Sequence, residues 1–407
     1  MQLNIAKRAP QLGAIALALA MTAGIAAAGS FEQPPSTSPA AALGPAWKGS
    51  NYTVLSPVSS DGLMRHYTLR TPFGDFEVTG DALMAARIKE LNALHALDET
   101  NAPKTFGEAA VKAGLGPVVF AGAMIAHPVD TTQNTFAGIG QFFGGVGSGL
   151  NNMGKSRDDA VASLTGEAKQ KRLIAAQLGV DPYTDFKPLA TRLDELAGAA
   201  AVGNLAVSGA FMAVPGAAGA VVSNTSTAST LQGMVADYSS AQLMDRNRDK
   251  LARLGVDRAV AESLFANPNY TPVDVTAMTE ALASLAGVKN LDAMVARAAA
   301  ADSRATAYFI RKRIEMTAAW QRRRRTIAAF AHDDDLRFPL CLTAGGGAVG
   351  AYPIDSLSWT PETARLFESM SSAAAGPKTL VITGTATPLA KSNLSALGWT
   401  VEERAKP

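Results

Sequence analysis

The carboxy-terminal stretch FPLCLTAGGGAVGAYP, residues 338–353, decides the fold class. Two short apolar runs flank three consecutive glycines at 345–347, which is the pattern of a β-hairpin with a tight turn. A helix is expected to begin after Thr360, a residue type that favours helix N-caps. We therefore predict a small α/β unit over 332–407. After the hairpin it has a helix, a strand, a helix and a strand, over 361–374, 378–383, 388–397 and 399–403.

Residues 51–100, near the other end of the chain, alternate between strand-forming and turn-forming segments. Three runs are rich in β-branched and aromatic residues: 52–58, 63–71 and 75–78. The short segments between them contain Gly, Pro, Ser and Asp, so we predict an antiparallel β meander. Asp81 is placed to cap a following helix over 82–97.

Residues 29–50 precede the meander and differ from it in composition. They are rich in Pro, Ser and Ala, and four of them are prolines. Because proline interrupts regular structure, we predict a flexible linker without helix.

The long middle of the chain, 101–331, is predicted to form helices joined by short turns, since strand signals are almost absent. Leu178–Asp181 and Leu254–Asp257 repeat the sequence Leu-Gly-Val-Asp, in which Gly ends one helix and Asp caps the next. The predicted fold is therefore α+β. It has a mainly helical body between the small N-terminal β meander and the C-terminal α/β unit.

Two segments of the helical body, 113–126 and 196–236, contain no charged residue. The second is expected to be a helical hairpin that turns at Pro215. We interpret both as buried core helices, because Ala and Gly contribute little to membrane insertion. Contact with a membrane face is one alternative, and insertion into the membrane is the other.

Residues 1–28 have the features of a secretion signal. Lys7 and Arg8 precede an apolar run over 12–25, and Ala26–Ala28 supply small residues for cleavage. This pattern predicts cleavage after Ala28 and a mature protein in the periplasm. The alternative is an uncleaved anchor helix, although the run is shorter than the roughly 20 residues that span a bilayer.

Composition limits the classes of partner and of chemistry. The formal net charge of +2 falls to near zero once Lys7 and Arg8 are removed, which argues against a nucleic-acid partner. With 407 residues, 47% of them hydrophobic, the chain is long enough to bury a sizeable core. The single cysteine, Cys341, has no partner for an intrachain disulfide, and we interpret it as a buried small hydrophobic residue.

The local motifs identify no cofactor or metal. Gly345, Gly347 and Gly350 fit a dinucleotide-binding spacing, but Pro353 would interrupt the helix that such a site requires. No metalloprotease, P-loop or nucleophile-elbow motif is present in the sequence. The run from His332 to Asp335 offers four consecutive potential ligands. Because neighbouring side chains on an extended chain point alternately, at most two of them would face one ion.

The strongest cluster of charge is basic and falls on a predicted helix whose apolar stripe contains Phe309, Met316, Trp320 and Ile327. Its seven basic residues flank this stripe and are our candidate surface for an anionic partner: Arg311, Lys312, Arg313, Arg322, Arg323, Arg324 and Arg325. The alternative is a solvated helix face that is paired with acidic neighbours.

Several short motifs resemble those of a group of exported proteobacterial proteins that have no assigned activity. They are spread over most of the mature chain: Asp61-Gly62, His66-Tyr67, Phe73-Gly74, Pro128-Val129-Asp130-Thr131 and Leu397-Gly398-Trp399-Thr400-Val401. The resemblance implies a shared fold and export, and it supplies no catalytic residue.

The leading functional hypothesis is an exported periplasmic envelope protein that acts by binding and not by catalysis. Its partner would be an envelope protein or an anionic lipid surface, and its oligomeric state is left open. The alternative is a periplasmic hydrolase whose site is assembled in space, with metal assistance from His332 and Asp333–Asp335.

Overall fold

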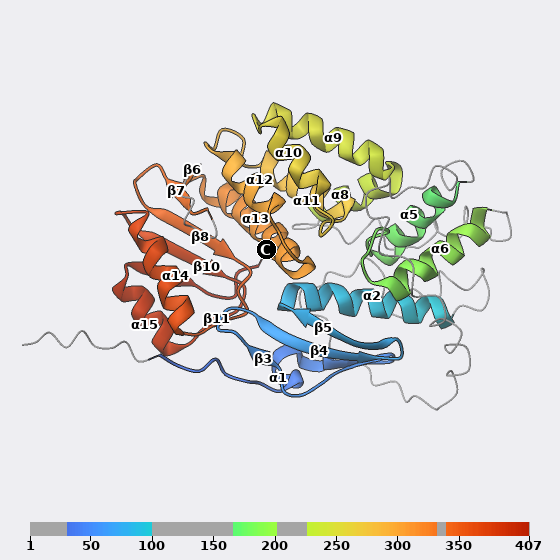
Figure 1. The fold of residues 1–407 in the computed structure, drawn as a ribbon, viewed down its shortest axis with the longest axis horizontal. Helices are drawn as coiled ribbons and strands as arrows, with labels where there is room; N and C mark the ends of the chain where they lie inside the picture. The colour runs from blue at the N-terminus through green and yellow to red at the C-terminus, as the bar shows by residue number, and fades with distance from the viewer. Residues whose placement is uncertain (1–30, 100–165, 202–225, 332–338, 407) are drawn as a thin grey trace, which may run out of the picture.

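The computed structural model describes residues 31–99, 166–201, 226–331 and 339–406 (Figure 1). The predicted α+β class is confirmed: an antiparallel sheet comes first, helices follow, and a mixed sheet with its own helices comes last. The predicted signal peptide (1–28), the uncharged segment 113–126, the turn at Pro215 and the run His332–Asp335 lie outside the described residues.

The N-terminal sheet is built around one long central strand, β4, which pairs antiparallel with β2, β3 and β5. Its strands are β1 (Lys48–Gly49), β2 (Tyr52–Val54), β3 (Ser59–Ser60), β4 (Arg65–Thr71) and β5 (Gly74–Thr79). Helix α2 (Asp81–Glu99) lies over this sheet (Figure 1). Tyr67 and Leu69 of β4 share a buried apolar cluster with Ile88 and Leu91 of α2. The predicted meander and its helix are therefore confirmed.

The predicted linker contains regular structure within its described part. Helix α1 (Pro39–Leu43) is followed by a 3₁₀ turn, η1 (Gly44–Trp47). The expectation that proline excludes helix here was wrong, because Pro39 occupies the first turn, where its missing N–H costs nothing. Ser38 also caps α1 by accepting a hydrogen bond from the Ala41 N–H at 3.2 Å.

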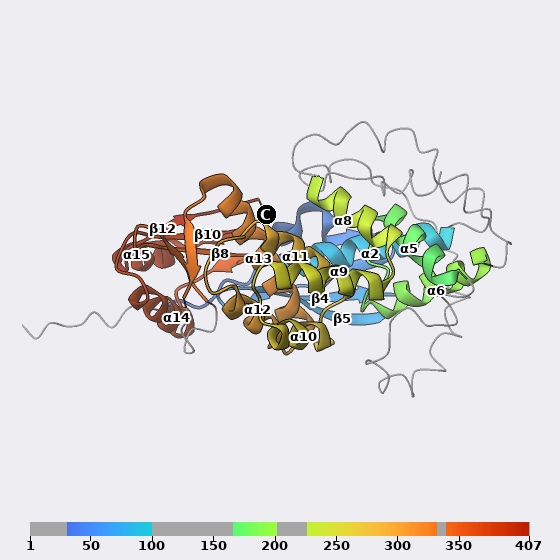
Figure 2. The same ribbon diagram turned by 90° about the horizontal axis from the view of Figure 1, so that it is seen from above.

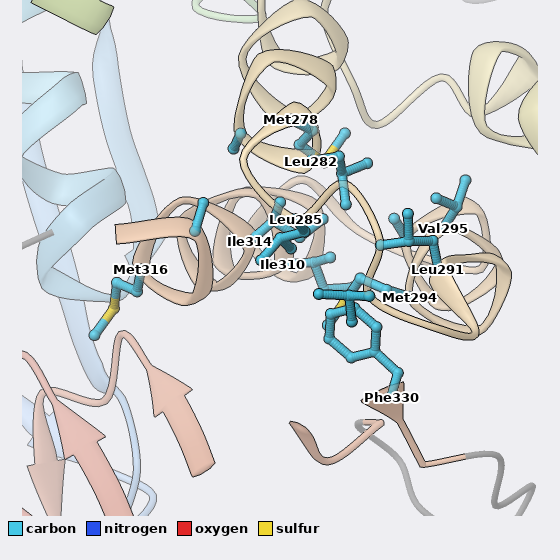
Figure 3. Packing of buried hydrophobic residues seen from close by; sticks show 14 of the residues in the cluster. Met278, Leu282, Leu285, Leu291, Met294, Val295, Ile310, Ile314, Met316 and Phe330 are labelled. Carbon is cyan, nitrogen blue, oxygen red and sulfur yellow. The ribbon is translucent and has the colours of Figure 1, made fainter. Parts of the chain in front are cut away.

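The middle of the described chain is helical, as predicted. Its elements are α5 (Glu167–Leu178), α6 (Lys187–Ala201), α8 (Ser226–Asp237), α9 (Ser240–Arg253), α10 (Arg258–Ala266), α11 (Pro272–Ala283), α12 (Leu291–Ala299) and α13 (Arg304–Arg324). Side chains from α11, α12 and α13 meet in one core, which Phe330 closes from the following strand (Figure 3). None of the helices in the described ranges combines the length and the apolar character that a membrane crossing needs.

The two repeated Leu-Gly-Val-Asp corners share the glycine conformation but differ in what the aspartate side chain binds. Gly179 and Gly255 both adopt the predicted left-handed conformation, with φ of 64° and 79°. Asp257 caps α10 as predicted, by accepting hydrogen bonds from two backbone N–H groups. Asp181 does not cap α6. Its carboxyl group accepts a hydrogen bond from the Tyr183 N–H at 2.8 Å and also contacts α11.

The C-terminal sheet has the strand order β12-β10-β8-β7-β6. Its strands are β6 (Ile327–Phe330), β7 (Cys341–Thr343), β8 (Ala348–Tyr352), β10 (Lys378–Ile382) and β12 (Trp399–Glu402), with a small ladder of β9 (Ser356–Leu357) and β11 (Thr385–Ala386) beside it. Strands β8, β10 and β12 run parallel, while β6, β7 and β8 run antiparallel. Helices α14 (Pro361–Ser372) and α15 (Pro388–Ala396) complete the unit.

The elements predicted from the local pattern are present in this unit. The glycine turn connects β7 to β8, and the Thr360 hydroxyl caps α14. One assignment was wrong: Ile327 lies on β6 and not on the preceding helix. Arg325 adopts a left-handed φ of 51° and ends α13, so the sheet begins before residue 332.

Candidate functional site

Helix α13 carries six of the seven basic residues of the candidate surface, and the seventh, Arg325, is its C-cap residue. Ser303 caps it by accepting a hydrogen bond from the Thr306 N–H. Figures 1 and 2 show α13 between strand β8 and helix α11, and it contacts both of them. The helix therefore joins the helical body to the C-terminal sheet, and its first half and its end meet different surroundings.

Arg311 and Lys312 lie in the first half and are neutralised by acidic side chains. The Arg311 guanidinium contacts Asp274 at 2.7 Å and Glu315 at 2.8 Å, and the Lys312 ammonium contacts Glu315 at 2.7 Å. Burial would raise the pKa of Glu315, but the facing Lys312 and Arg311 outweigh it and lower this pKa to about 2. These two cations are therefore engaged within the fold.

Arg313 is part of the core, with 0% of its surface exposed. Its guanidinium donates a hydrogen bond to the Pro339 carbonyl oxygen and lies 4.7 Å from the centre of the Tyr352 ring. Arg311 and Lys312 are therefore half-buried, Arg313 is fully buried, and the contacts of all three lie within the fold.

The other four basic residues, Arg322, Arg323, Arg324 and Arg325, are all exposed, and we call them the arginine collar. Successive residues of a helix point about 100° apart, so these side chains spread around the end of α13 and do not line one face. Within the described residues, the collar side chains contact neutral groups. Arg322 donates a hydrogen bond to the Ser284 hydroxyl at 3.1 Å, and the Arg324 guanidinium lies 5.3 Å from the centre of the Trp320 ring. Within the described part of the chain, no collar residue forms an ion pair.

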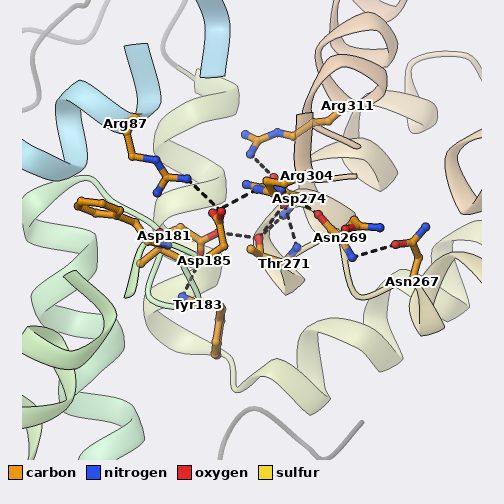
Figure 4. Close-up of polar contacts among 12 residues, drawn as sticks. Arg87, Asp181, Tyr183, Asp185, Asn267, Asn269, Thr271, Asp274, Arg304 and Arg311 are labelled. Atoms are coloured by element: carbon orange, nitrogen blue, oxygen red, sulfur yellow. Dashed lines mark hydrogen bonds and ion pairs between the residues drawn. The ribbon is translucent and has the colours of Figure 1, made fainter. Parts of the chain in front are cut away.

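Asp274 is the centre of a buried polar cluster (Figure 4). Its side chain is 0% exposed and contacts Arg311 at 2.7 Å and Arg304 at 2.5 Å. It also accepts a hydrogen bond from the Thr271 N–H at 2.8 Å, as part of the capping box of α11. Burial would raise the pKa of Asp274, but the two facing guanidinium groups lower it to about 2. Asp274 is therefore ionised in the folded protein.

The loop between α5 and α6, residues 179–186, attaches to this cluster, and we call it the α5–α6 corner. Asp185 contacts Arg87 of α2 at 3.0 Å and Arg304 of α13 at 3.3 Å. The Thr184 hydroxyl donates a hydrogen bond to Glu90 of α2. Burial raises the pKa of Glu90 to about 7, although Arg87 opposes the shift. The cluster thus fastens α2, the corner, α11 and α13 to one another.

Asp355 forms a second junction, between the N-terminal sheet and the C-terminal unit. It is 1% exposed, and one carboxyl oxygen accepts hydrogen bonds at 3.0 Å from the N–H groups of Arg65 and Asp81. Burial and then the charge of Asp81 raise the pKa of Asp355 to about 8. The predicted capping role of the Asp81 side chain was wrong, because its carboxylate instead contacts Tyr67 and Arg65, each at 2.5 Å.

Two further candidates from the sequence, Cys341 and the glycine run, lie within the described residues. Cys341 is buried, as predicted, and burial raises the pKa of its thiol to about 11. Strand β8 continues through Gly350 to Tyr352, so the glycine run is a hairpin turn and no helix opens there. Among the described residues, no three His, Cys, Asp or Glu side chains are placed to hold a metal ion. His332 and Asp333–Asp335, on which the hydrolase alternative depends, lie outside that range.

Sequence reasoning missed the polar cluster because its members come from remote parts of the chain. Asp274 and Arg304 are separated by the whole of α12, and Arg87 precedes both by most of the helical body. The one local signal is Thr271-Pro-Val-Asp274, which matches a capping box before an apolar run.

No protein-family model, no curated protein and no solved structure matches the chain. The resemblance to exported proteobacterial proteins therefore stays a prediction.

Proposed function

We propose that this chain is an exported periplasmic protein that binds an anionic membrane surface through the arginine collar and acts by binding, not by catalysis. The observation that carries the proposal is the exposure of Arg322–Arg325 at the end of α13, where no acidic residue of the described chain pairs with them. The predicted secretion signal places the mature chain where phospholipid headgroups are accessible.

Guanidinium chemistry supports a phosphate-bearing partner. Arginine presents planar, forked donors that match phosphate oxygens, and it keeps its charge at any physiological pH. Each basic side chain near an anionic bilayer contributes about 1 kcal/mol, so four of them supply roughly 4 kcal/mol, or on the order of 10³ in affinity. The helix dipole also favours cations at this end, but it accounts for only about 0.3–1 kcal/mol for each charge.

The buried half of α13 provides a fixed support for the collar. Arg311 is attached to α11 through Asp274, and Arg313 is attached to the segment before β7 through Pro339. Because these contacts fix the helix on two sides, the collar projects from a rigid element. Less backbone conformational entropy is then lost when a partner binds.

The test is sedimentation of the mature protein with vesicles that contain phosphatidylglycerol, compared with vesicles of phosphatidylcholine alone. We expect binding to the anionic vesicles only, and a loss of about 100-fold or more when Arg322, Arg323, Arg324 and Arg325 are all replaced by alanine. A matched variant removes four exposed basic side chains elsewhere and should bind as the unmodified protein does: Arg253→Ala, Arg258→Ala, Arg365→Ala and Lys391→Ala.

Equal losses in the two variants would show a response to net charge alone and would contradict a site at the collar. If the unmodified protein binds no vesicle, the lipid proposal is wrong, and an anionic envelope protein becomes the partner to test.

A further inference from the structure

The Thr271 hydroxyl lies between two carboxyl groups. Its oxygen is 2.5 Å from Asp181 and 3.0 Å from Asp274, and it also accepts a hydrogen bond from the Asp274 N–H at 3.1 Å (Figure 4). A hydroxyl group has one hydrogen and can donate it to only one of the two carboxyl groups. The other carboxyl group must then carry a hydrogen of its own if that contact is to be favourable.

The surroundings decide which carboxyl group carries the hydrogen. Asp274 faces Arg304 and Arg311 and accepts from the Thr271 N–H, so it is the ionised partner. Asp181 makes no ion pair in the described structure. A protonated Asp181 can donate a hydrogen bond to the Thr271 hydroxyl oxygen, and the Thr271 hydroxyl group then donates its own hydrogen to Asp274. In this arrangement each of the three groups has a hydrogen-bond partner.

The charges around Asp181 lead to the same assignment. The groups that face this cluster are Arg87 and Glu90 from α2, Asp185 from the corner, Asp274 from α11, and Arg304, Arg311, Lys312 and Glu315 from α13. Helices α8 and α9 pack against the corner with apolar side chains, Val235 and Leu243. Tyr270, before α11, stays neutral because burial raises its pKa, and Arg297 of α12 faces it.

Asp181 differs from the other four carboxyl groups of this cluster. Glu90, Asp185, Asp274 and Glu315 each form an ion pair with at least one of the cations, whereas Asp181 forms none in the described structure. An ionised Asp181 would therefore be a buried carboxylate without a paired cation, which is costly, and a proton on Asp181 removes that charge.

We propose that Asp181 holds a proton in the folded protein and that loss of this proton releases the α5–α6 corner from α11, so that this contact is a pH-sensitive joint. Burial and the charge of Asp274 raise the pKa of Asp181 to about 6. Because this folded-state pKa is above the ordinary value of about 3.9, the hydrogen bond between Asp181 and Thr271 is fully stabilising below pH 4. Its stabilisation is lost as the pH rises through about 6. The joint does not depend on what the collar binds.

Hydrogen exchange of residues 179–186 in the mature protein tests the joint at pH 4.5 and at pH 6.5, after correction for the intrinsic rates. In this range Glu90, whose pKa is about 7, stays mostly protonated. We expect protection of the corner to fall on the order of tenfold at the higher pH, while strand β10 is unchanged. Asp181→Asn supplies an amide donor in place of the acid hydrogen and should show no such fall.

A fall of less than about twofold in the unmodified protein, or an equal fall in Asp181→Asn, would overturn the proposal. If the variant does not fold, carboxyl carbon NMR of the unmodified protein decides. A titration midpoint of Asp181 above pH 5 supports the joint, and a midpoint at or below pH 5 overturns it.

Discussion

Arg311 and Arg323 lie on the same helix and meet opposite surroundings. Arg311, in the first half of α13, is partly buried and contacts the carboxylates of Asp274 and Glu315. Arg323, in the collar, is exposed, and its guanidinium donates a hydrogen bond to the Ala319 carbonyl oxygen of its own helix, at 3.3 Å. The difference teaches that a basic run has no single role. Acids brought close by remote helices decide whether an arginine stabilises the fold or is available to a partner.

The largest expected effect on stability comes from removing the Asp274 carboxylate, which pairs with two arginines of α13. Asp274→Asn leaves Arg304 and Arg311 without their shared carboxylate, and breaking a buried pair costs about 3–5 kcal/mol. Urea unfolding at pH 6 measures the change in the free energy of unfolding. The control is Asp245→Asn, whose side chain is 75% exposed in its pair with Arg248 and which should cost at most about 1 kcal/mol. Similar costs for the two variants would remove the distinction between buried and exposed arginines.

The pH dependence of stability tests the buried carboxyl groups whose pKa is raised by burial. The pKa values of Glu90 and Asp355 are raised to about 7 and about 8, so their protonated forms stabilise the fold, and this stabilisation is lost as the pH rises through those values. Asp274 and Glu315, with pKa values near 2, act in the opposite sense below pH 4. The urea midpoint should therefore be highest near pH 4–5 and should fall toward pH 8.

Asp355→Asn isolates the junction between the two sheets. The amide oxygen can still accept from the N–H groups of Arg65 and Asp81, and no charge forms when the pH is raised. We expect this variant to exceed the unmodified protein by about 1 kcal/mol or more at pH 8, one pKa unit being about 1.4 kcal/mol. An unchanged slope between pH 6 and pH 8 in this variant would show that Asp355 is not a source of the decline.

The smallest expected effect on stability belongs to the collar. Arg323→Ala should change the free energy of unfolding by less than about 0.5 kcal/mol, because the side chain is exposed and makes no ion pair within the described residues. Arg311→Ala should cost several-fold more in the same urea assay. If Arg323→Ala destabilised the protein as strongly as Arg311→Ala, the collar would be structural and its proposed role in binding would lose its basis.

Elements with local signals could be predicted from the sequence. The glycine turn before β8 and the Thr360 cap of α14 depend on residues within a few positions, and both are present as predicted. Helix α1 was missed because the density of prolines outweighed the favourable positions of Ser38 and Pro39. Strand β6 was missed because the helical period continues through Ile327, and only the left-handed Arg325 ends the helix.

The candidate site was predictable only in part. The exposure of Arg322–Arg325 follows from their place at a helix end, but the burial of Arg311–Arg313 depends on Asp274, Glu315 and Pro339. Asp274 and Pro339 come from other elements and carry no sequence signal that links them to α13. Asp81 and Asp181 show the same limit, because each resembles a helix cap in sequence and contacts a remote element in the fold.

Arginine modification by phenylglyoxal tests both ends of α13 in one measurement, with mass spectrometry of the mature protein in the presence and absence of phosphatidylglycerol vesicles. We predict that Arg322–Arg325 react in the free protein and are protected by the vesicles, while Arg304, Arg311 and Arg313 stay unreacted in both samples. Reaction of Arg311 as fast as that of Arg323, or a collar that reacts equally with and without vesicles, would contradict the account.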